Sequence, residues 1–192
     1  MNICVFCGSS RGAHPNYGAA ARALGAAIAG RGYGLVYGGA SVGLMGMVAD
    51  GALAEGGRVV GVLPRSMAEK ELAHKSLHDL HLVDSMHTRK AMMADRADGF
   101  IALPGGIGTL EEAFEIWTWG QLGYHRKPLG LLNIGGFYDK LAGFLDHITG
   151  EGFVQPQHRA MAIVTDDIGT MLDRIERYEP PAVTKWIDRG SR

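Results

Sequence analysis

Residues 99–112 read GFIALPGGIGTLEE. A continuously apolar run opens this stretch, a glycine-rich turn follows it, and a helical pattern occupies residues 109–122. Continuously apolar strands that alternate with helices are typical of a parallel sheet covered on both faces. The stretch therefore predicts one strand–turn–helix unit of such a sheet.

The same unit recurs along the chain. Strands are predicted at residues 2–8, 34–39, 58–64, 79–84, 99–106, 127–134 and 161–165. Helices are predicted at residues 16–30, 44–55, 85–97, 109–122, 138–150 and 168–178. This alternation indicates an α/β fold with a doubly wound, mostly parallel sheet. We expect one domain over residues 1–178 and a C-terminal extension over 179–192, which contains two prolines near its start.

Composition narrows the function classes. The chain has 192 residues, 46% of them hydrophobic, and a formal net charge of −1. Such a charge gives no basic field for nucleic acid or an anionic membrane, and we expect neither as a partner. A nucleotide pocket needs only local charge, so a small-molecule protein is favoured. The sequence shows no charged and apolar leader and no run long enough to span a bilayer, so we expect a cytoplasmic protein.

The only cysteines, Cys4 and Cys7, form a C-x-x-C pattern. Such a pattern can carry redox chemistry at a helix start. Here it falls on a predicted strand, where residues three apart point to opposite faces. Two buried, reduced thiols are therefore the preferred interpretation.

Four polar or glycine-rich segments follow predicted strands. In a doubly wound sheet, ligands bind beyond the carboxyl ends of the strands, where the following helices begin. These segments should converge on one site although they are far apart in sequence: CGSSRG at 7–12, GGASVGLMG at 38–46, SMHTRK at 85–90 and PGGIGTLEE at 104–112.

The loop at residues 38–46 is a candidate phosphate-binding segment through Gly39, Ser41 and Gly43. Glycines at a strand-to-helix turn let backbone N–H groups approach phosphate oxygens. The spacing matches neither the dinucleotide fingerprint nor the P-loop. Tight turns with close packing explain the same glycines, and this loop alone does not decide between the two interpretations.

The loop at residues 104–112 gives a sharper signal. Gly105, Gly106 and Gly108 form a turn, and the Thr109 hydroxyl is suited to a phosphate oxygen. The residues alone favour the other interpretation, in which Thr109 caps the helix and Glu112 folds back as the other half of a capping box. Glu111 suits the positive end of the helix dipole.

Arg89 and Lys90 lie near the start of a helix that Ser85 is expected to cap. Cations at this end oppose the helix dipole. A bound anion or a nearby carboxylate such as Glu112 would reverse that penalty. The alternative is a solvated surface pair of little consequence.

Histidine and tryptophan residues give weaker signals. His74 and His78 have i, i+4 spacing, but the remaining ligands of a metal site are missing, so we expect no metal. Trp117 belongs to an apolar helical face and suits the core. Trp119 lies off that face, and a subunit interface would explain it.

Taken together, the motifs resemble a known family. PGGIGTLEE fits the signature P-G-G-x-G-T-x-x-E, and GGASVGLMG, MHTRKA and TWGQLGYHRKPLGLLN accompany it. The chain is similar, from Asn2 to about Tyr178, to the Lonely Guy (LOG) family of phosphoribohydrolases. Its members hydrolyse cytokinin riboside 5′-monophosphates, and bacterial relatives also cleave AMP. The resemblance implies a Rossmann-like homodimer that binds a purine nucleoside 5′-monophosphate and uses no cofactor.

The resemblance also implies roles for individual residues. Arg89 and Glu112 match the catalytic pair, and Lys90 matches a substrate-binding residue. Glu71 and Thr118 match further substrate contacts. The phosphate loop is implied at Gly105, Gly106, Ile107, Gly108 and Thr109, with Glu111 beside it. Ile107 stands where plant members commonly have tyrosine, which leaves the base preference open.

Three functions follow as alternatives. The first is hydrolysis of an N-glycosidic bond, with Glu112 stabilising the positively charged sugar. The second is a non-catalytic nucleotide or cofactor carrier, which needs the glycine loops but not the Arg89–Glu112 pair. The third is a pyridoxal-phosphate lysine decarboxylase with Lys90 as the Schiff-base residue, for which the sequence offers no convincing partner set.

Overall fold

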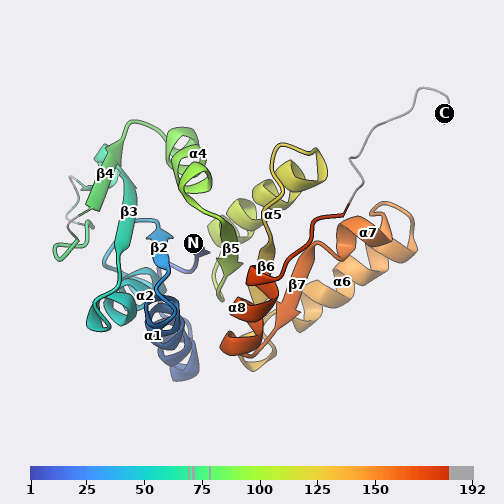
Figure 1. The fold of residues 1–192 in the computed structure, drawn as a ribbon, viewed down its shortest axis with the longest axis horizontal. Coiled ribbons are helices and arrows are strands. Elements are labelled where there is room, and N and C mark those ends of the chain that lie inside the picture. Colours follow the sequence, from blue (N-terminus) through green and yellow to red (C-terminus); the bar gives the residue numbers. More distant parts are fainter. Residues whose placement is uncertain (69, 71, 78, 182–192) are drawn as a thin grey trace.

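A single parallel sheet of seven strands forms the centre of the molecule (Figure 1). The computed structural model describes residues 1–181 apart from 69, 71 and 78. All seven predicted strands are confirmed, although most end one to four residues earlier than predicted, because the final residues already belong to loops. The strands are β1 (Asn2–Phe6), β2 (Gly34–Tyr37), β3 (Val59–Pro64), β4 (Asp79–Val83), β5 (Gly99–Ala102), β6 (Leu129–Leu132) and β7 (Ala162–Thr165).

The six predicted helices are also confirmed, with bounds that differ by one or two residues. They are α1 (Pro15–Gly30), α2 (Gly43–Ala54), α4 (Met86–Arg96), α5 (Ile107–Gln121), α6 (Asp139–Gly150) and α8 (Ile168–Glu176). The short elements α3 (Arg65–Ala68), α7 (Pro156–Arg159) and η1 (Ile134–Gly136) were not predicted. Segments of three or four residues are too short to show a helical period.

Helices cover both faces of the sheet, as the doubly wound pattern requires. Residues of α1, α2 and α8 pack into one hydrophobic cluster, and residues of α4, α5 and α6 pack into a second one. Cys7 belongs to the first cluster and Cys4 to the second, which confirms that the two residues lie on opposite faces. Both are buried free thiols, and burial raises the pKa of each above its ordinary value.

The strands are arranged in the order β4-β3-β2-β1-β5-β6-β7. The chain first adds strands on one side of β1, up to β4, and then adds β5, β6 and β7 on the other side, so the strand order reverses at β1. The chain therefore leaves β1 and β5 towards opposite faces, which opens a crevice at the carboxyl ends of these neighbouring strands. Backbone hydrogen bonds tie three loops together there. The amide of Gly8 donates to the Pro104 carbonyl at 3.2 Å, and the amide of Leu44 donates to the Gly8 carbonyl at 3.0 Å.

Two expectations from the sequence, the C-terminal extension and the roles of Glu71 and His78, concern residues that the structure does not describe. Most of the predicted C-terminal extension, residues 182–192, lies outside the described residues, as do Glu71 and His78. The division of the chain at residue 178 therefore stays a prediction. None of the helices in the described ranges has the length and apolar character needed to cross a bilayer.

Candidate active site

The four segments expected to converge do line a common region at the carboxyl edge of the sheet. A cavity of about 380 Å³ is bounded by the end of β1, by Gly38 after β2, by the first turns of α4 and by the glycine turn before α5. A volume of this size is within the range of small-ligand pockets. Seven of the predicted site residues line it: Arg89, Gly106, Ile107, Gly108, Thr109, Glu111 and Glu112.

Arg89 and Glu112 form a buried ion pair inside this cavity. Arg89 Nη1 lies 2.6 Å from Glu112 Oε1, and only 9% and 11% of the two side chains are exposed. Arg89 Nε also donates to the Val62 carbonyl at 3.1 Å, which fixes the guanidinium against β3. The carboxylate expected to offset the cation at the start of α4 is therefore Glu112.

Thr109 does not cap α5, so the predicted capping box is wrong. The helix begins at Ile107, with Gly106 at the N-cap position and Thr109 already inside the first turn. Glu112 bonds to Arg89 instead of folding back on the Thr109 amide. In the Arg89–Glu112 bond both partners are charged, whereas in the capping box only the carboxylate would be, so the ion pair is the stronger interaction. Ser85 behaves as predicted, because its hydroxyl accepts a hydrogen bond from the Thr88 amide at 3.1 Å.

Two opposing effects act on the pKa of Glu112. Burial raises it, and the neighbouring Arg89 charge lowers it, so that the pKa stays above the ordinary value of 4.5. Buried carboxylates with raised pKa values beside a charge partner are common among catalytic groups.

The loop after β2 packs against the Arg89 side chain of this ion pair. A Cβ atom at Gly38 would overlap the Arg89 guanidinium, so glycine at this position leaves room for the side chain in its observed place. Gly39 and Gly43 have φ angles of 75° and 60°, which favour glycine. Neither of them lines the cavity, and Ser41 bonds to the Leu72 carbonyl through its amide at 2.9 Å.

Replacing Gly38 by alanine is expected to lower kcat by roughly ten- to a hundredfold, because a displacement of about 1 Å in a catalytic group has that effect. The melting temperature should fall as well, because the displaced guanidinium belongs to a buried ion pair and also bonds to the Val62 carbonyl. Steady-state kinetics and a thermal melt measure the two effects. Gly30→Ala is the matched control, because a Cβ atom there meets nothing within 4 Å. Unchanged turnover in Gly38→Ala would contradict the prediction.

Thr118 is not close to the phosphate loop. It is exposed and lies nine residues beyond Thr109 on α5, or about 14 Å along the helix axis. The resemblance assigned it a substrate contact, and within this chain it does not line the cavity.

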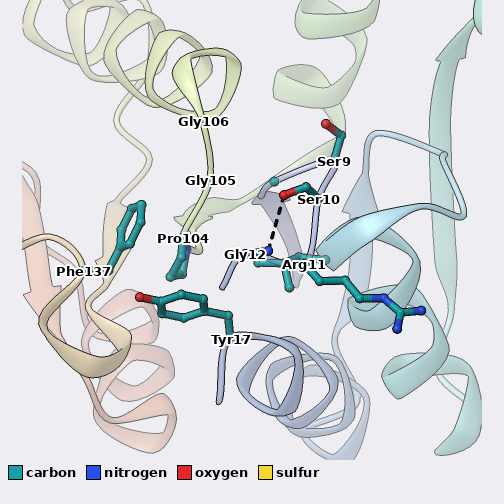
Figure 2. Close-up of a pocket in the computed structure, with 11 residues that line it drawn as sticks. Ser9, Ser10, Arg11, Gly12, Tyr17, Pro104, Gly105, Gly106 and Phe137 are labelled. Carbon is teal, nitrogen blue, oxygen red and sulfur yellow. Dashed lines mark hydrogen bonds between the residues drawn. The ribbon is translucent and has the colours of Figure 1, made fainter. Parts of the chain in front are cut away.

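A second cavity of about 330 Å³ lies beside the first and shares Gly8, Ser9 and Gly106 with it (Figure 2). Tyr17 and Phe137 form part of its wall, with ring centroids 5.8 Å apart at an angle of 79°. The sequence analysis missed both residues. Aromatic side chains at such positions suit an ordinary core equally well, so no signal in the sequence distinguishes them.

His74, one of the two histidines with i, i+4 spacing, bonds to neighbouring residues of the fold. His74 is buried, its Nε2 atom lies 3.1 Å from Asp50 Oδ1, and its Nδ1 atom accepts a hydrogen bond from the Ser76 amide. Within the described residues, no group of three or more His, Cys, Asp or Glu side chains could hold a metal ion.

Comparison with known proteins identifies the family. The sequence profile of a family described as "Possible lysine decarboxylase" matches residues 45–175. The cytokinin riboside 5′-monophosphate phosphoribohydrolase LOG7 of Arabidopsis thaliana is 49% identical over 179 residues, which are 93% of this chain and 82% of the relative. The probable enzyme LOGL5 of Oryza sativa subsp. japonica is also 49% identical, over 93% of this chain and 73% of its own. The chain belongs to the LOG family.

Solved structures resemble the fold of this LOG-family chain at lower identity. The molybdenum cofactor carrier protein of Chlamydomonas reinhardtii has a TM-score of 0.70 and 22% identity, over 92% of this chain and 95% of its own. The molybdenum cofactor binding protein of Rippkaea orientalis has the same score and identity, over 91% and 94% of the two chains. Likeness at this identity shows the Rossmann-like fold alone.

The surroundings of Lys90 argue against the chemistry in the profile's description. Its Nζ atom lies 2.5 Å from Glu111 Oε1 and 2.9 Å from Glu115 Oε2. Burial lowers the pKa of Lys90, but the two carboxylates outweigh it and the pKa is raised above its ordinary value. A Schiff-base lysine must present a neutral amine, whereas this LOG-family chain holds Lys90 protonated between α4 and α5. Glu115 was missed, although it follows Glu111 by one helical turn.

Proposed function

We propose that this LOG-family chain hydrolyses the N-glycosidic bond of cytokinin riboside 5′-monophosphates and releases the free base and ribose 5-phosphate. AMP is a second substrate under the same proposal. Relatives with 46–49% identity are named for the cytokinin reaction. The observation that carries the proposal for this chain is the buried Arg89–Glu112 pair, which faces the glycine turn at the start of α5.

The phosphate group is proposed to lie at residues 105–109. Amides at the start of a helix have no partner within the helix and carry the positive end of its dipole, so they suit an anion. A Cβ atom at Gly106 or Gly108 would meet nothing within 4 Å, so the turn is open to a ligand. Thr109 is buried with its hydroxyl against Gly105, which holds the turn in this shape.

Glu112 is proposed to act on the sugar. Cleavage breaks the bond between the anomeric carbon and the base nitrogen, and water then supplies a hydroxyl to the carbon and a proton to balance the leaving base. The anomeric carbon carries positive charge in between, and a nearby carboxylate stabilises that charge. Arg89 orients the carboxylate and opposes its protonation.

A non-catalytic carrier accounts for less of the site. It would use the glycine turn to hold a phosphate, but it has no need of a buried carboxylate beside the sugar. Burying an ion pair has a desolvation cost, and such a pair is weak support for stability. The pair at Arg89 and Glu112 therefore favours catalysis over simple binding.

Product analysis tests the proposal. The purified protein is incubated with AMP and, separately, with N6-isopentenyladenosine monophosphate, and the products are separated by chromatography. Free base and ribose 5-phosphate are expected in both mixtures. Intact nucleotide in both, together with measurable binding by calorimetry, would reject the hydrolase and favour the carrier.

The acid side of the pH–rate profile reports on Glu112. The ionised fraction of a carboxyl falls as the pH drops below its pKa, so activity that needs the carboxylate is lost on the acid side. Because the pKa of Glu112 is raised, the loss should begin at a higher pH than the ordinary value of 4.5 would give. Measuring kcat between pH 4 and pH 8 tests this, with circular dichroism at each pH to exclude unfolding. An acid limb below pH 4.5 would be contrary to this prediction.

Supporting roles for the other predicted residues belong to the same proposal. Lys90 and Glu111 are proposed to border the phosphate and ribose, since their ion pair lies next to the turn. Gly39, Ser41 and Gly43 are proposed to act by shaping the loop behind Arg89. Glu71 and Thr118 remain assignments from family resemblance alone. Each of these residues can be replaced by alanine and its KM and kcat measured. A higher KM indicates a role in substrate binding, and a lower kcat indicates a role in positioning the Arg89–Glu112 pair.

A homodimer is also proposed. Several large apolar side chains on α5 and just after it are exposed, with exposed fractions of 37% for Phe114, 44% for Leu122 and 77% for Tyr124. Trp119 is half-buried beside them, and such residues are enriched at protein interfaces. Light scattering of the purified chain gives the mass directly, and a mass of one chain would reject the dimer.

A cytoplasmic location is proposed on the state of the thiols. Cys4 and Cys7 are both free, and they point to opposite faces of the sheet, so they are not placed to pair with each other. Reduced buried cysteines suit a reducing compartment. Fractionation of cells that express the protein tests the location.

A further inference from the structure

Two kinds of side chain line the catalytic cavity. Three are charged, those of Arg89, Glu111 and Glu112. Four are methionines, which come from α2, α3 and α4 and which we call the methionine wall: Met45, Met67, Met86 and Met93. The whole chain has nine methionines, so nearly half of them gather at this one cavity. Such a gathering is more than the scattered gap-filling that methionine performs in cores.

The exposures of these residues show how the thioether wall runs from the ion pair to the solvent. Met93 is 1% exposed, and the Met45 sulfur lies 2.9 Å from the position of a Cβ atom at Gly38, beside the Arg89 guanidinium. Met67 is half-buried, and Met86 is 47% exposed. Ile107, which is 82% exposed, borders the same cavity at the start of α5. The apolar lining thus includes both buried side chains beside the ion pair and side chains exposed to solvent.

The described lining offers few groups that could read the hydrogen-bonding edge of a base. Its polar side chains are those of Ser9, Arg89, Thr109, Glu111 and Glu112, and it includes no asparagine, glutamine or histidine. Arg89 and Glu112 already bond to each other, and Thr109 packs on the glycine turn. A site that selects a base through hydrogen bonds needs groups built for that purpose. Apolar contact is what this wall can supply.

We propose that Met67 and Met86, with Ile107, hold the purine base and an apolar substituent on its N6 atom, and so make the chain prefer an N6-prenylated nucleotide to AMP. This inference rests on the proposed function and assigns the residues that set its substrate preference. Thioethers contact aromatic rings favourably and adapt to substituents of different size. Each buried methylene of the substituent is worth roughly a fourfold gain in binding, so even partial contact gives a measurable preference.

Glutamine replaces methionine at nearly the same length but makes the wall polar. In Met67→Gln and Met86→Gln, the ratio of kcat/KM for N6-isopentenyladenosine monophosphate to that for AMP is expected to fall about four- to fifteenfold, as if one or two methylene contacts were lost. Met67→Leu keeps the wall apolar and should preserve the ratio. Met92→Gln is the matched control, because Met92 lies on α4 but does not line the cavity. Any general loss of stability there affects both substrates alike.

Inhibition by ribose 5-phosphate separates the base wall from the rest of the site. This product lacks the base, so its inhibition constant should be the same in the wild type and in the glutamine variants. The assignment would be overturned if an active glutamine variant kept the wild-type ratio of the two kcat/KM values. It would also be overturned if the variant lost as much affinity for ribose 5-phosphate as it lost for the prenylated nucleotide. If the wild type cleaves neither nucleotide, the proposed function fails, and the same ratio measured as binding affinities by calorimetry still decides the role of the wall.

Discussion

Replacing Glu112 by glutamine is expected to lower kcat by ~10²–10⁴-fold, the usual contribution of one positioned acid–base group. Glutamine keeps the size of the side chain and an oxygen that can accept from Arg89, but it removes the negative charge. The sugar would then develop its positive charge without a carboxylate beside it. Nucleotide binding should weaken much less than turnover, because the glycine turn is unchanged.

Glu111→Gln is the comparison for this variant. Glu111 is the next residue on the same helix, yet its side chain is 52% exposed and pairs with Lys90 instead of Arg89. We expect a far smaller loss of kcat. Thermal melts establish that both variants fold, and single-turnover kinetics give the rate of base release. If Glu112→Gln kept more than a tenth of the wild-type rate, the catalytic assignment would be wrong.

Replacing Arg89 by methionine is expected to remove most activity and about 3–5 kcal/mol of stability, the usual cost of leaving one member of a buried pair alone. Arg89 lowers the pKa of Glu112, so its removal raises that pKa further. A carboxyl with a raised pKa in the folded state is stabilising below its unfolded pKa, and that stability is lost as the pH rises through the folded pKa. The deficit of Arg89→Met should therefore be largest at neutral and alkaline pH and smaller in acid.

Urea unfolding of both proteins at several pH values measures this deficit. The double variant Arg89→Met/Glu112→Gln is the control, because removing both charges is often nearly neutral for stability. It should recover much of the lost free energy of unfolding while remaining inactive. A deficit that does not vary with pH, or a double variant no more stable than Arg89→Met, would show that the pair is not a buried charge pair in solution.

The fold was predictable because its strands are short apolar runs between glycine-rich turns. β1 and β5 are fully or almost fully buried, and their sequences contain little else than apolar residues. The convergence of the loops at one edge followed from parallel topology alone. The four-residue helices α3 and α7 were not predictable in this way, since they lack a periodic pattern.

The site was predictable in its residues but not in its contacts. Arg89 and Glu112 stood out because of their charges at helix starts, yet local chemistry also favoured a bond between Glu112 and Thr109. Only the approach of α4 to α5 decides against that bond, and sequence spacing does not encode it. The same holds for Lys90 and Glu115, whose side chains meet across two helices. The methionine wall is likewise a property of the assembled fold, because its members come from three separate helices.

The reversal of strand order at β1 has a consequence for how the chain folds. β1 pairs with β2 on one side and with β5 on the other, and Cys4 aligns with Phe100, nearly a hundred residues later. Pairings between such distant segments are entropically costly and slow to form. The glycine turn and the β1 loop come together across this pairing, so the cavity is complete only when β1 and β5 are paired. A nucleotide that binds there selects molecules that have completed their folding and shifts the population towards them.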